Sequence, residues 1–169
     1  MQSHERCSVV EVMGRHAGYL ALYVGISVGA TAVLIPEREL DFERDVVEKI
    51  RRARLAGTTH YMVGGAEGAG NTMEISQQIR DEIGLDPRVT VLGHIQRGGA
   101  PSARDRETAS RMGYKAVEAV SQNAGNCVIA TQEGRLVVMD MEKALVMTKE
   151  FNMDRYNILE ALTNNSSFH

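Results

Sequence analysis

The sequence predicts an α/β fold: a three-layer domain with a mostly parallel central sheet of about four strands, helices on both faces, and a C-terminal hairpin with short helices. Its short apolar runs are nearly continuous rather than alternating, which is typical of parallel strands covered on both sides. The segments between these runs repeat apolar residues at helical spacing. Because strand-like and helix-like segments alternate, we expect right-handed crossover connections.

The predicted strands are short and rich in β-branched residues. They cover residues 7–13, 31–36, 60–67 and 89–93. Two further runs, 127–131 and 136–139, flank Glu133 and Gly134, a turn signal that predicts a hairpin.

Predicted helices fill the segments between the strands. Residues 17–28 are mostly apolar and predict a buried helix, whereas residues 41–55 place an apolar stripe opposite Glu and Arg side chains. Residues 71–84 begin with Asn71 and Glu74 at the spacing of a helix-start capping arrangement.

A longer helical pattern follows Pro101, and we expect it to pack on the sheet. Its apolar face consists of Ala109, Met112, Gly113, Ala116, Val117 and Val120. Two short helices are predicted over residues 141–147 and 156–162.

Composition and charge favour one soluble domain. With 169 residues and 43% hydrophobic content, we expect a single domain over residues 1–163 and a disordered tail over 164–169. The net charge of −3 gives no overall attraction to nucleic acid or to an anionic membrane, and no apolar run is long enough to span one. We therefore expect a cytoplasmic protein. Cys7 and Cys127 lack a CxxC pattern, which favours buried thiols over a disulfide or a metal site.

Polar clusters follow three of the predicted strands. They are Met13, Gly14 and Arg15 after the first run, Glu67 and Gly68 after the third, and residues 94–99 after the fourth. Because ligands of such domains bind outside the carboxyl ends of the strands, we expect these clusters to share one edge of the sheet. His94 and Arg97, followed by two glycines, suit a phosphate. Arg6 and Arg88 stand at the opposite ends of their strands, away from that edge.

Each of these residues also has a structural interpretation. Gly98 and Gly99 could form a turn that enters a helix, and His94 alone could be a hydrogen-bonded structural histidine. Glu67 could cap the following helix, and Arg15 could be an ordinary surface cation. Their joint position at strand ends favours a shared binding site.

These clusters, in this order and at these separations, resemble the C-terminal, sugar-phosphate-binding domain of the bacterial-type ATP-dependent 6-phosphofructokinases. The resemblance rests on RCSVVEVMGRHAG at 6–18, on Pro36 and Glu37, on Glu67, and on VLGHIQRGG at 91–99 continuing to Pro101, Asp105 and Arg106. It extends over most of residues 6–139 without a gap, and this combination is far more specific than a lone glycine motif.

The resemblance implies roles for the first two clusters. Met13, Gly14 and Arg15 match the segment that holds fructose 6-phosphate, and Arg15 is the catalytic residue that also approaches the phosphoryl group in transit. Glu67 matches the carboxylate that accepts hydrogen bonds from the sugar hydroxyls.

The same resemblance assigns the basic residues to the substrate's phosphate. His94 and Arg97 match ligands of the 6-phosphate. Arg6 and Arg88 match arginines that reach the same phosphate from a neighbouring subunit, so the resemblance implies a homo-oligomer.

Two motifs of the family's N-terminal half are absent from this sequence: a GGDGS-like loop for ATP, and a TIDND-like segment whose aspartates bind magnesium and act as the base. We therefore expect a truncated product, an expressed fragment or one half of a split protein, partnered by the missing ATP-binding domain. We expect no cofactor or metal site in this chain and no turnover alone, although ATP and magnesium are implied for the full-length enzyme.

Two alternative functions stay open. The chain could be a non-catalytic sugar-phosphate-binding or assembly module. It could also derive from a pyrophosphate-dependent phosphofructokinase, because the residues that select the donor lie in the missing half.

A departure from the resemblance concerns regulation. Thr31, Ala56 and Thr58 stand where regulated members carry an acidic residue and lysines that form the effector site. A site without its cations should hold a polyanion poorly, so we expect no regulation by nucleoside diphosphate or phosphoenolpyruvate.

Overall fold

A computed structural model describes residues 5–148 and 150–164. The chain forms two compact units: unit 1 comprises Met1–Gly98 and Phe151–His169, and unit 2 comprises Gly99–Glu150. The two units are described separately, so the expected single domain over residues 1–163 stays a prediction. Asn164 ends the last helix, and the rest of the expected tail lies outside the described residues.

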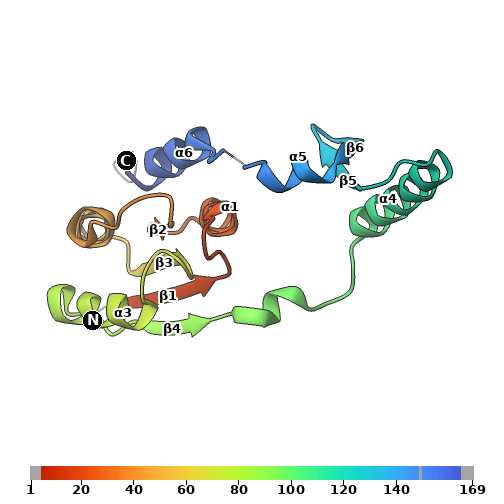
Figure 1. Ribbon diagram of the computed structural model, residues 1–169. Coiled ribbons are helices and arrows are strands. Elements are labelled where there is room, and N and C mark those ends of the chain that lie inside the picture. The colour runs from red at the N-terminus through yellow and green to blue at the C-terminus, as the bar shows by residue number, and fades with distance from the viewer. Residues whose placement is uncertain (1–4, 149, 165–169) are drawn as a thin grey trace. The chain divides into compact units, whose positions relative to one another are not determined.

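Unit 1 contains a four-stranded parallel sheet with the order β2-β3-β1-β4 (Figure 1). The strands are β1 (Arg6–Val12), β2 (Ala32–Leu34), β3 (His60–Ala66) and β4 (Arg88–Val91). In the register, Val9 stands beside Val63 of β3 and Val89 of β4. The predicted parallel sheet is thereby confirmed, with β1 between β3 and β4.

Helices cover both faces of this sheet, because successive strand residues point to opposite sides. On one face, Val9 and Val63 pack with Ile50 and Ile79. These residues come from α2 (Glu48–Leu55), which continues a π-helical turn, η1 (Glu43–Val47), and from α3 (Thr72–Ile83). On the other face, Val33 packs with side chains of α1 (Tyr19–Val28) and α6 (Met153–Asn164). The predicted three-layer fold class is confirmed.

Two helices of unit 1 test the sequence predictions in detail. The side-chain oxygen of Asn71 accepts hydrogen bonds from the backbone N–H groups of Met73 and Glu74, so the predicted capping of α3 is confirmed. The prediction that residues 17–28 form a buried helix is wrong for the outward side of α1, where Tyr23 is 61% exposed and Val28 is 52% exposed. Because α1 is apolar on all sides, its sequence does not show which of its sides is buried and which is exposed.

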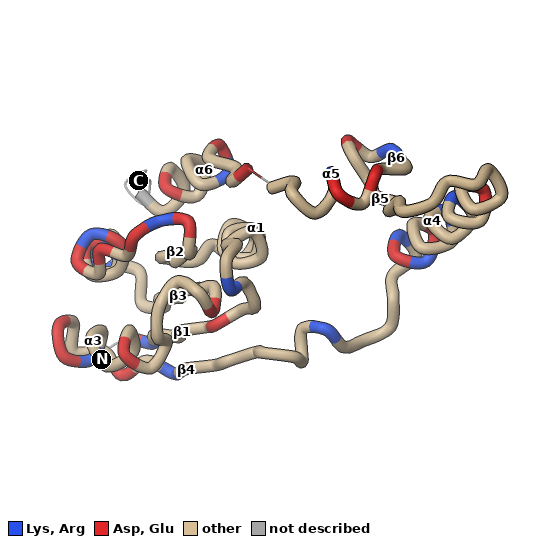
Figure 2. The backbone as a smooth tube through the Cα atoms, viewed as in Figure 1, with Lys and Arg blue, Asp and Glu red and all other residues tan. Residues whose placement is uncertain are grey.

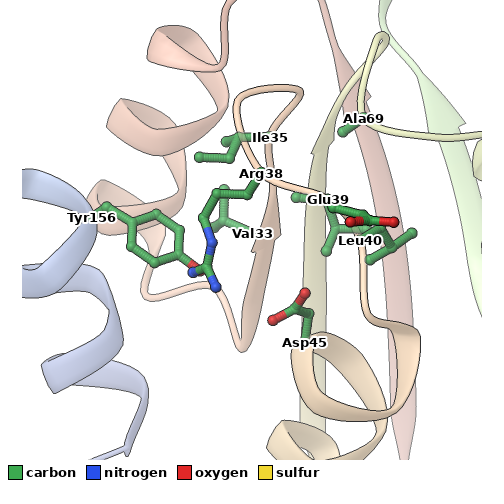
Figure 3. A pocket seen from close by; sticks show the side chains of 9 residues that line it. Val33, Ile35, Arg38, Glu39, Leu40, Asp45, Ala69 and Tyr156 are labelled. Atoms are coloured by element: carbon green, nitrogen blue, oxygen red, sulfur yellow. The ribbon is translucent and has the colours of Figure 1, made fainter. Parts of the chain in front are cut away.

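Helix α6 is anchored to unit 1 by one aromatic and one ionic contact. The Tyr156 ring lies 4.5 Å from the guanidinium carbon of Arg38, and burial raises the pKa of Tyr156 to about 12 (Figure 3). The ammonium of Lys49, a buried residue, lies 2.5 Å from a carboxylate oxygen of Glu160. Leu159 is also buried, so α6 completes the core of unit 1.

Unit 2 consists of α4 (Ala103–Ser121), the antiparallel strands β5 (Cys127–Gln132) and β6 (Arg135–Asp140), and α5 (Met141–Val146). Ser102 and Asp105 form a reciprocal capping box at the start of α4. The predicted hairpin is confirmed. Within this unit, α4 contacts β5 and β6. The expectation that this helix packs on the parallel sheet stays a prediction.

None of the helices within the described ranges combines the length and the apolar character that crossing a membrane requires.

Candidate functional site

The chain connections create a crevice at one edge of the sheet in unit 1. From the carboxyl end of β1 the chain enters α1 on one face, whereas from the neighbouring β3 it enters α3 on the opposite face. Such a switch point leaves an opening beyond the strand ends, where ligands of open α/β sheets bind. Because β4 flanks β1 on its other side, three loops meet at this opening.

The six residues expected to bind substrate line one open hollow at this edge, with a volume of about 660 Å³. They are Met13, Gly14, Arg15, Glu67, His94 and Arg97. The first three follow β1, Glu67 follows β3, and the last two lie in a 3-10 turn, η2 (Gly93–Arg97), after β4. The structure therefore brings together residues that are up to 84 positions apart in sequence, from Met13 to Arg97.

Two glycines let the loops of the hollow approach closely. Gly14 has a φ of +149°, and a Cβ atom there would lie 2.4 Å from the carbonyl oxygen of Ala17. A Cβ on Gly68 would lie 1.8 Å from the carbonyl oxygen of Arg15. Any other residue at either position would displace the segment that carries Arg15.

Long hydrogen bonds connect the three loops. The Gly14 N–H donates to a Glu67 carboxylate oxygen at 3.4 Å, and the Met13 N–H donates to the side-chain oxygen of Gln96, also at 3.4 Å. The Gln96 amide in turn donates to the Gly93 carbonyl oxygen. We infer that Gln96 positions the β1 loop against η2.

Sequence reasoning did not single out Gln96 or the close approach at Gly68. Gln96 stands between His94 and Arg97 within one turn, so its place inside the basic motif was the only available signal. Nothing in the sequence around Gly68 distinguishes it from an ordinary turn glycine.

The charges of the hollow suit an anionic ligand that carries hydroxyl groups. Arg15, His94 and Arg97 contribute basic groups, Glu67 contributes the one carboxylate among the lining residues, and all four side chains are exposed. Arg97 is the only Lys or Arg between Arg88 and Arg104, as the charge colouring of this segment shows (Figure 2). Exposed arginines can bind a phosphate through paired hydrogen bonds.

Magnesium does not fit the hollow. Its hard cation chemistry calls for oxygen ligands supplied by carboxylates and a nucleotide's phosphates, and the hollow offers only Glu67 beside three basic residues. Within residues 5–148 and 150–164, no three His, Cys, Asp or Glu side chains gather in a way that could hold a metal ion.

Arg6 and Arg88 lie at the opposite edge of the sheet. Both line a second hollow at the amino ends of the strands, so the structure does not bring them to the six-residue hollow. Beside them, Glu5 accepts hydrogen bonds from Arg54 at 2.9 and 2.8 Å and from the Tyr61 hydroxyl at 2.8 Å. The Arg54 hydrogen bond, followed by that of Tyr61, lowers the pKa of Glu5.

Thr31 and Thr58, two of the three positions discussed for regulation, line a cavity of about 170 Å³ near the same amino-end edge. Leu159 and Leu162 of α6 line it as well, whereas Ala56 lies exposed beyond the end of α2. The cavity has no Lys or Arg among its lining residues. The expected absence of effector regulation stays a prediction.

Comparisons with known sequences identify close relatives. The family model of phosphofructokinase matches residues 1–120. An ATP-dependent 6-phosphofructokinase of Clostridium botulinum (strain Alaska E43 / Type E3) is 45% identical over 162 residues, which are 95% of this chain and 50% of the relative. The corresponding enzyme of Bacillus thuringiensis (strain Al Hakam) is 44% identical over 161 residues, with the same coverage of 95% and 50%. The chain thus spans about half the length of these curated relatives.

Solved structures show the same similarity. The phosphofructokinase of Pichia pastoris in the T-state superposes with a TM-score of 0.75 at 35% identity, over 97% of this chain and 18% of that one. A pyrophosphate-dependent phosphofructokinase from Nitrosospira multiformis has a TM-score of 0.74 at 22% identity, over 89% of this chain and 43% of that one. The second likeness establishes the fold alone.

Proposed function

Because the chain belongs to the phosphofructokinase family, we propose that it is the fructose 6-phosphate-binding part of an ATP-dependent 6-phosphofructokinase. One observation carries the proposal: the residues that match the family's sugar-phosphate motifs at three strand ends line one hollow. Its volume of about 660 Å³ lies within the range of small-molecule sites. The ATP donor rests on the names of relatives that are 43–45% identical.

Each lining residue has a part in the proposed binding. His94 and Arg97 would hold the 6-phosphate, since they lie together on η2 at the end of β4. Glu67 would accept hydrogen bonds from sugar hydroxyls while it keeps its contact with the Gly14 N–H. Arg15 would face the phosphoryl group in transit and neutralise the charge that develops there.

The 169 residues alone are expected to bind substrate without transferring phosphate. A bound nucleotide with magnesium would supply the phosphoryl group, and the hollow contains neither a ligand set for magnesium nor a second carboxylate to act as a base. We place both functions in the part of the protein that is homologous to the unmatched half of the relatives. A cytoplasmic location is part of this proposal.

Arg6 and Arg88 fit the proposal only if the protein forms a homo-oligomer. They lie at the edge opposite the hollow, so they can reach a phosphate only in the hollow of a second copy. A symmetric arrangement would place each pair in the neighbour's site.

Calorimetry with fructose 6-phosphate tests the proposal. We expect saturable binding by the unaltered chain, weakened about 10- to 100-fold by Arg97→Ala, because a hydrogen bond to a charged group contributes about 1.5–3 kcal/mol. Arg135→Ala, which removes an exposed arginine of β6, is the matched control and should bind like the unaltered chain. Equal affinities for all three proteins would refute the assignment.

A coupled assay separates the binding part from a complete enzyme. With ATP, magnesium and fructose 6-phosphate, the purified chain should give no turnover above background. Robust ATP-dependent turnover would contradict the proposal that this chain binds substrate and another part of the protein binds ATP. Binding without turnover is expected both for an enzyme part and for a non-catalytic binding module. Adding a polypeptide with the missing half distinguishes the two, because only an enzyme part would gain activity.

A further inference from the structure

The loop between β1 and α1, residues 13–18, carries Arg15 and is held at both ends by carboxylates. Near its start, the Gly14 N–H donates to Glu67, which follows β3, at 3.4 Å. At its end, the Gly18 N–H donates to a carboxylate oxygen of Glu37, which follows β2, at 2.8 Å. The contact with Glu37 is the shorter of the two, so it is the firmer attachment of this loop.

Glu37 itself stands on a turn that the core of unit 1 holds in place. Ile35 is buried, and the ring of Pro36 restricts the backbone that follows it. The Arg38 N–H donates to the Ile35 carbonyl oxygen at 3.3 Å and closes the turn. The Arg38 guanidinium lies over the ring of Tyr156, as Figure 3 shows. Because both sides of the turn are anchored, Glu37 offers the loop a fixed acceptor.

The end of the loop approaches Glu37 so closely that residue 18 has no room for a side chain. Gly18 is buried, and a Cβ atom there would lie 2.4 Å from Ile35 Cγ2 and 2.8 Å from Glu37 Oε2. In α1, all of which the structure describes, the first turn carries no acidic residue. Glu37 therefore supplies the negative charge that favours the start of this helix.

We propose that Glu37 is a positioning residue that holds Arg15 at the sugar-phosphate site. This inference rests on the proposed function, in which Arg15 faces the phosphoryl group in transit. The Arg15 side chain is exposed, so its backbone determines where it can reach. Glu37 is not among the residues that line the hollow, and its effect on a ligand must pass through the loop. A loop fixed at both ends lowers the entropic cost of ordering Arg15 on a phosphate.

Binding of fructose 1,6-bisphosphate reports on the position of Arg15, because this product carries the transferred phosphoryl group at its 1-position. By calorimetry, we expect Arg15→Ala and Glu37→Ala each to weaken binding of the bisphosphate about tenfold. Glu37→Ala should weaken binding of fructose 6-phosphate by less than about threefold, since His94 and Arg97 are unchanged. Glu39→Ala removes an exposed carboxylate from the same segment and is the matched control (Figure 3). It should bind both ligands like the unaltered chain.

A double-mutant cycle separates positioning from a purely structural role. If Glu37 acts through Arg15, Glu37→Ala should weaken bisphosphate binding by less than about twofold in a chain that already carries Arg15→Ala. Glu37→Gln keeps an oxygen acceptor for the Gly18 N–H and should restore most of the affinity. Equal losses in the two backgrounds would show that Glu37 only supports the fold. That result, or no loss with Glu37→Ala, would overturn the proposal.

Amide hydrogen exchange without ligand tests the loop contact separately from the proposed function. The Gly18 amide should exchange at least about tenfold faster in Glu37→Ala and recover in Glu37→Gln, while the amides of β3 keep their rates. Unchanged Gly18 exchange in Glu37→Ala would refute the positioning role. Faster exchange in Glu37→Ala, when the unaltered chain binds neither sugar phosphate, would sink the proposed function and leave the contact between Glu37 and the loop standing.

Discussion

Unit 1 and unit 2 have similar sequence patterns and different degrees of burial. Unit 1 places two clusters of buried side chains on the two faces of its sheet, and residues such as Ile50 and Ile79 are fully buried. Unit 2 carries the same apolar periodicity along α4, yet Ala119 is the only buried residue among those described there. The comparison shows that periodicity identifies an apolar face and that the fold decides what covers it.

The difference also bears on the site. All six residues of the hollow belong to unit 1, where a complete core supports the strands that carry them. We expect substrate binding to depend on the stability of unit 1 and to be insensitive to changes in unit 2.

Core substitutions should have the largest effect on the free energy of unfolding. Ile50→Ala should lower the free energy of unfolding by about 2–5 kcal/mol, because it leaves a cavity at a fully buried position. Leu145→Ala in unit 2 should change it by no more than about 0.5 kcal/mol, since that residue is 76% exposed. Urea unfolding followed by circular dichroism measures both. Similar losses for the two variants would break the comparison.

The second-largest expected effect is on the free energy of unfolding when an ion pair is broken in each unit. Glu160→Ala leaves the buried ammonium of Lys49 without its partner, and we expect a loss of about 1–3 kcal/mol. Glu118→Ala removes the partner of Lys115, in a pair whose side chains are both partly exposed, and should cost about 0–1 kcal/mol. The same urea titrations apply, and a larger loss for Glu118→Ala would contradict the proposed anchoring of α6.

A smaller, pH-dependent effect is expected at the amino-end edge of unit 1. The folded state lowers the pKa of Glu5 below its ordinary value of 4.5, so its hydrogen bonds with Arg54 and Tyr61 stabilise the protein above that value. The contribution is lost as the pH falls through the lowered pKa. The difference in unfolding free energy between the unaltered chain and Glu5→Gln should be greatest near pH 7 and shrink towards pH 3. A difference that does not vary with pH would rule this out.

The smallest effect concerns the thiols, one in each unit. Burial raises the pKa of Cys7 to about 11, so about one molecule in a thousand would carry its thiolate at pH 8. Cys127 is only partly buried. Thiol-reagent labelling of the native chain, located by mass spectrometry, should modify Cys127 well before Cys7. Faster labelling of Cys7 would show that unit 1 opens more readily than unit 2.

Much of the fold could be predicted from sequence. The four parallel strands, the hairpin and the Asn71 cap follow from local patterns, because β-branched runs and capping residues act over a few positions. An apolar stripe alone does not identify the layer that a helix packs on, since it fits any apolar surface of suitable shape, so the packing of α4 on the sheet stays a prediction. The exposed side of α1 was missed for the same reason.

Some features of the site could also be predicted from sequence, and others could not. Residues at strand ends could be identified because parallel strands end at a common edge, which places Glu67 near Arg15 and Arg97. The hydrogen bond from Met13 to Gln96 and the tight approach at Gly68 could not, because they depend on loop geometry and distances between segments.

A crystal structure of the chain with fructose 6-phosphate tests the central claim most directly. We predict that the phosphate lies within about 3 Å of the His94 and Arg97 side-chain nitrogens, and that a sugar hydroxyl donates to Glu67. A sugar phosphate bound at the edge of Arg6 and Arg88 of its own chain, with the six-residue hollow left empty, would contradict the account.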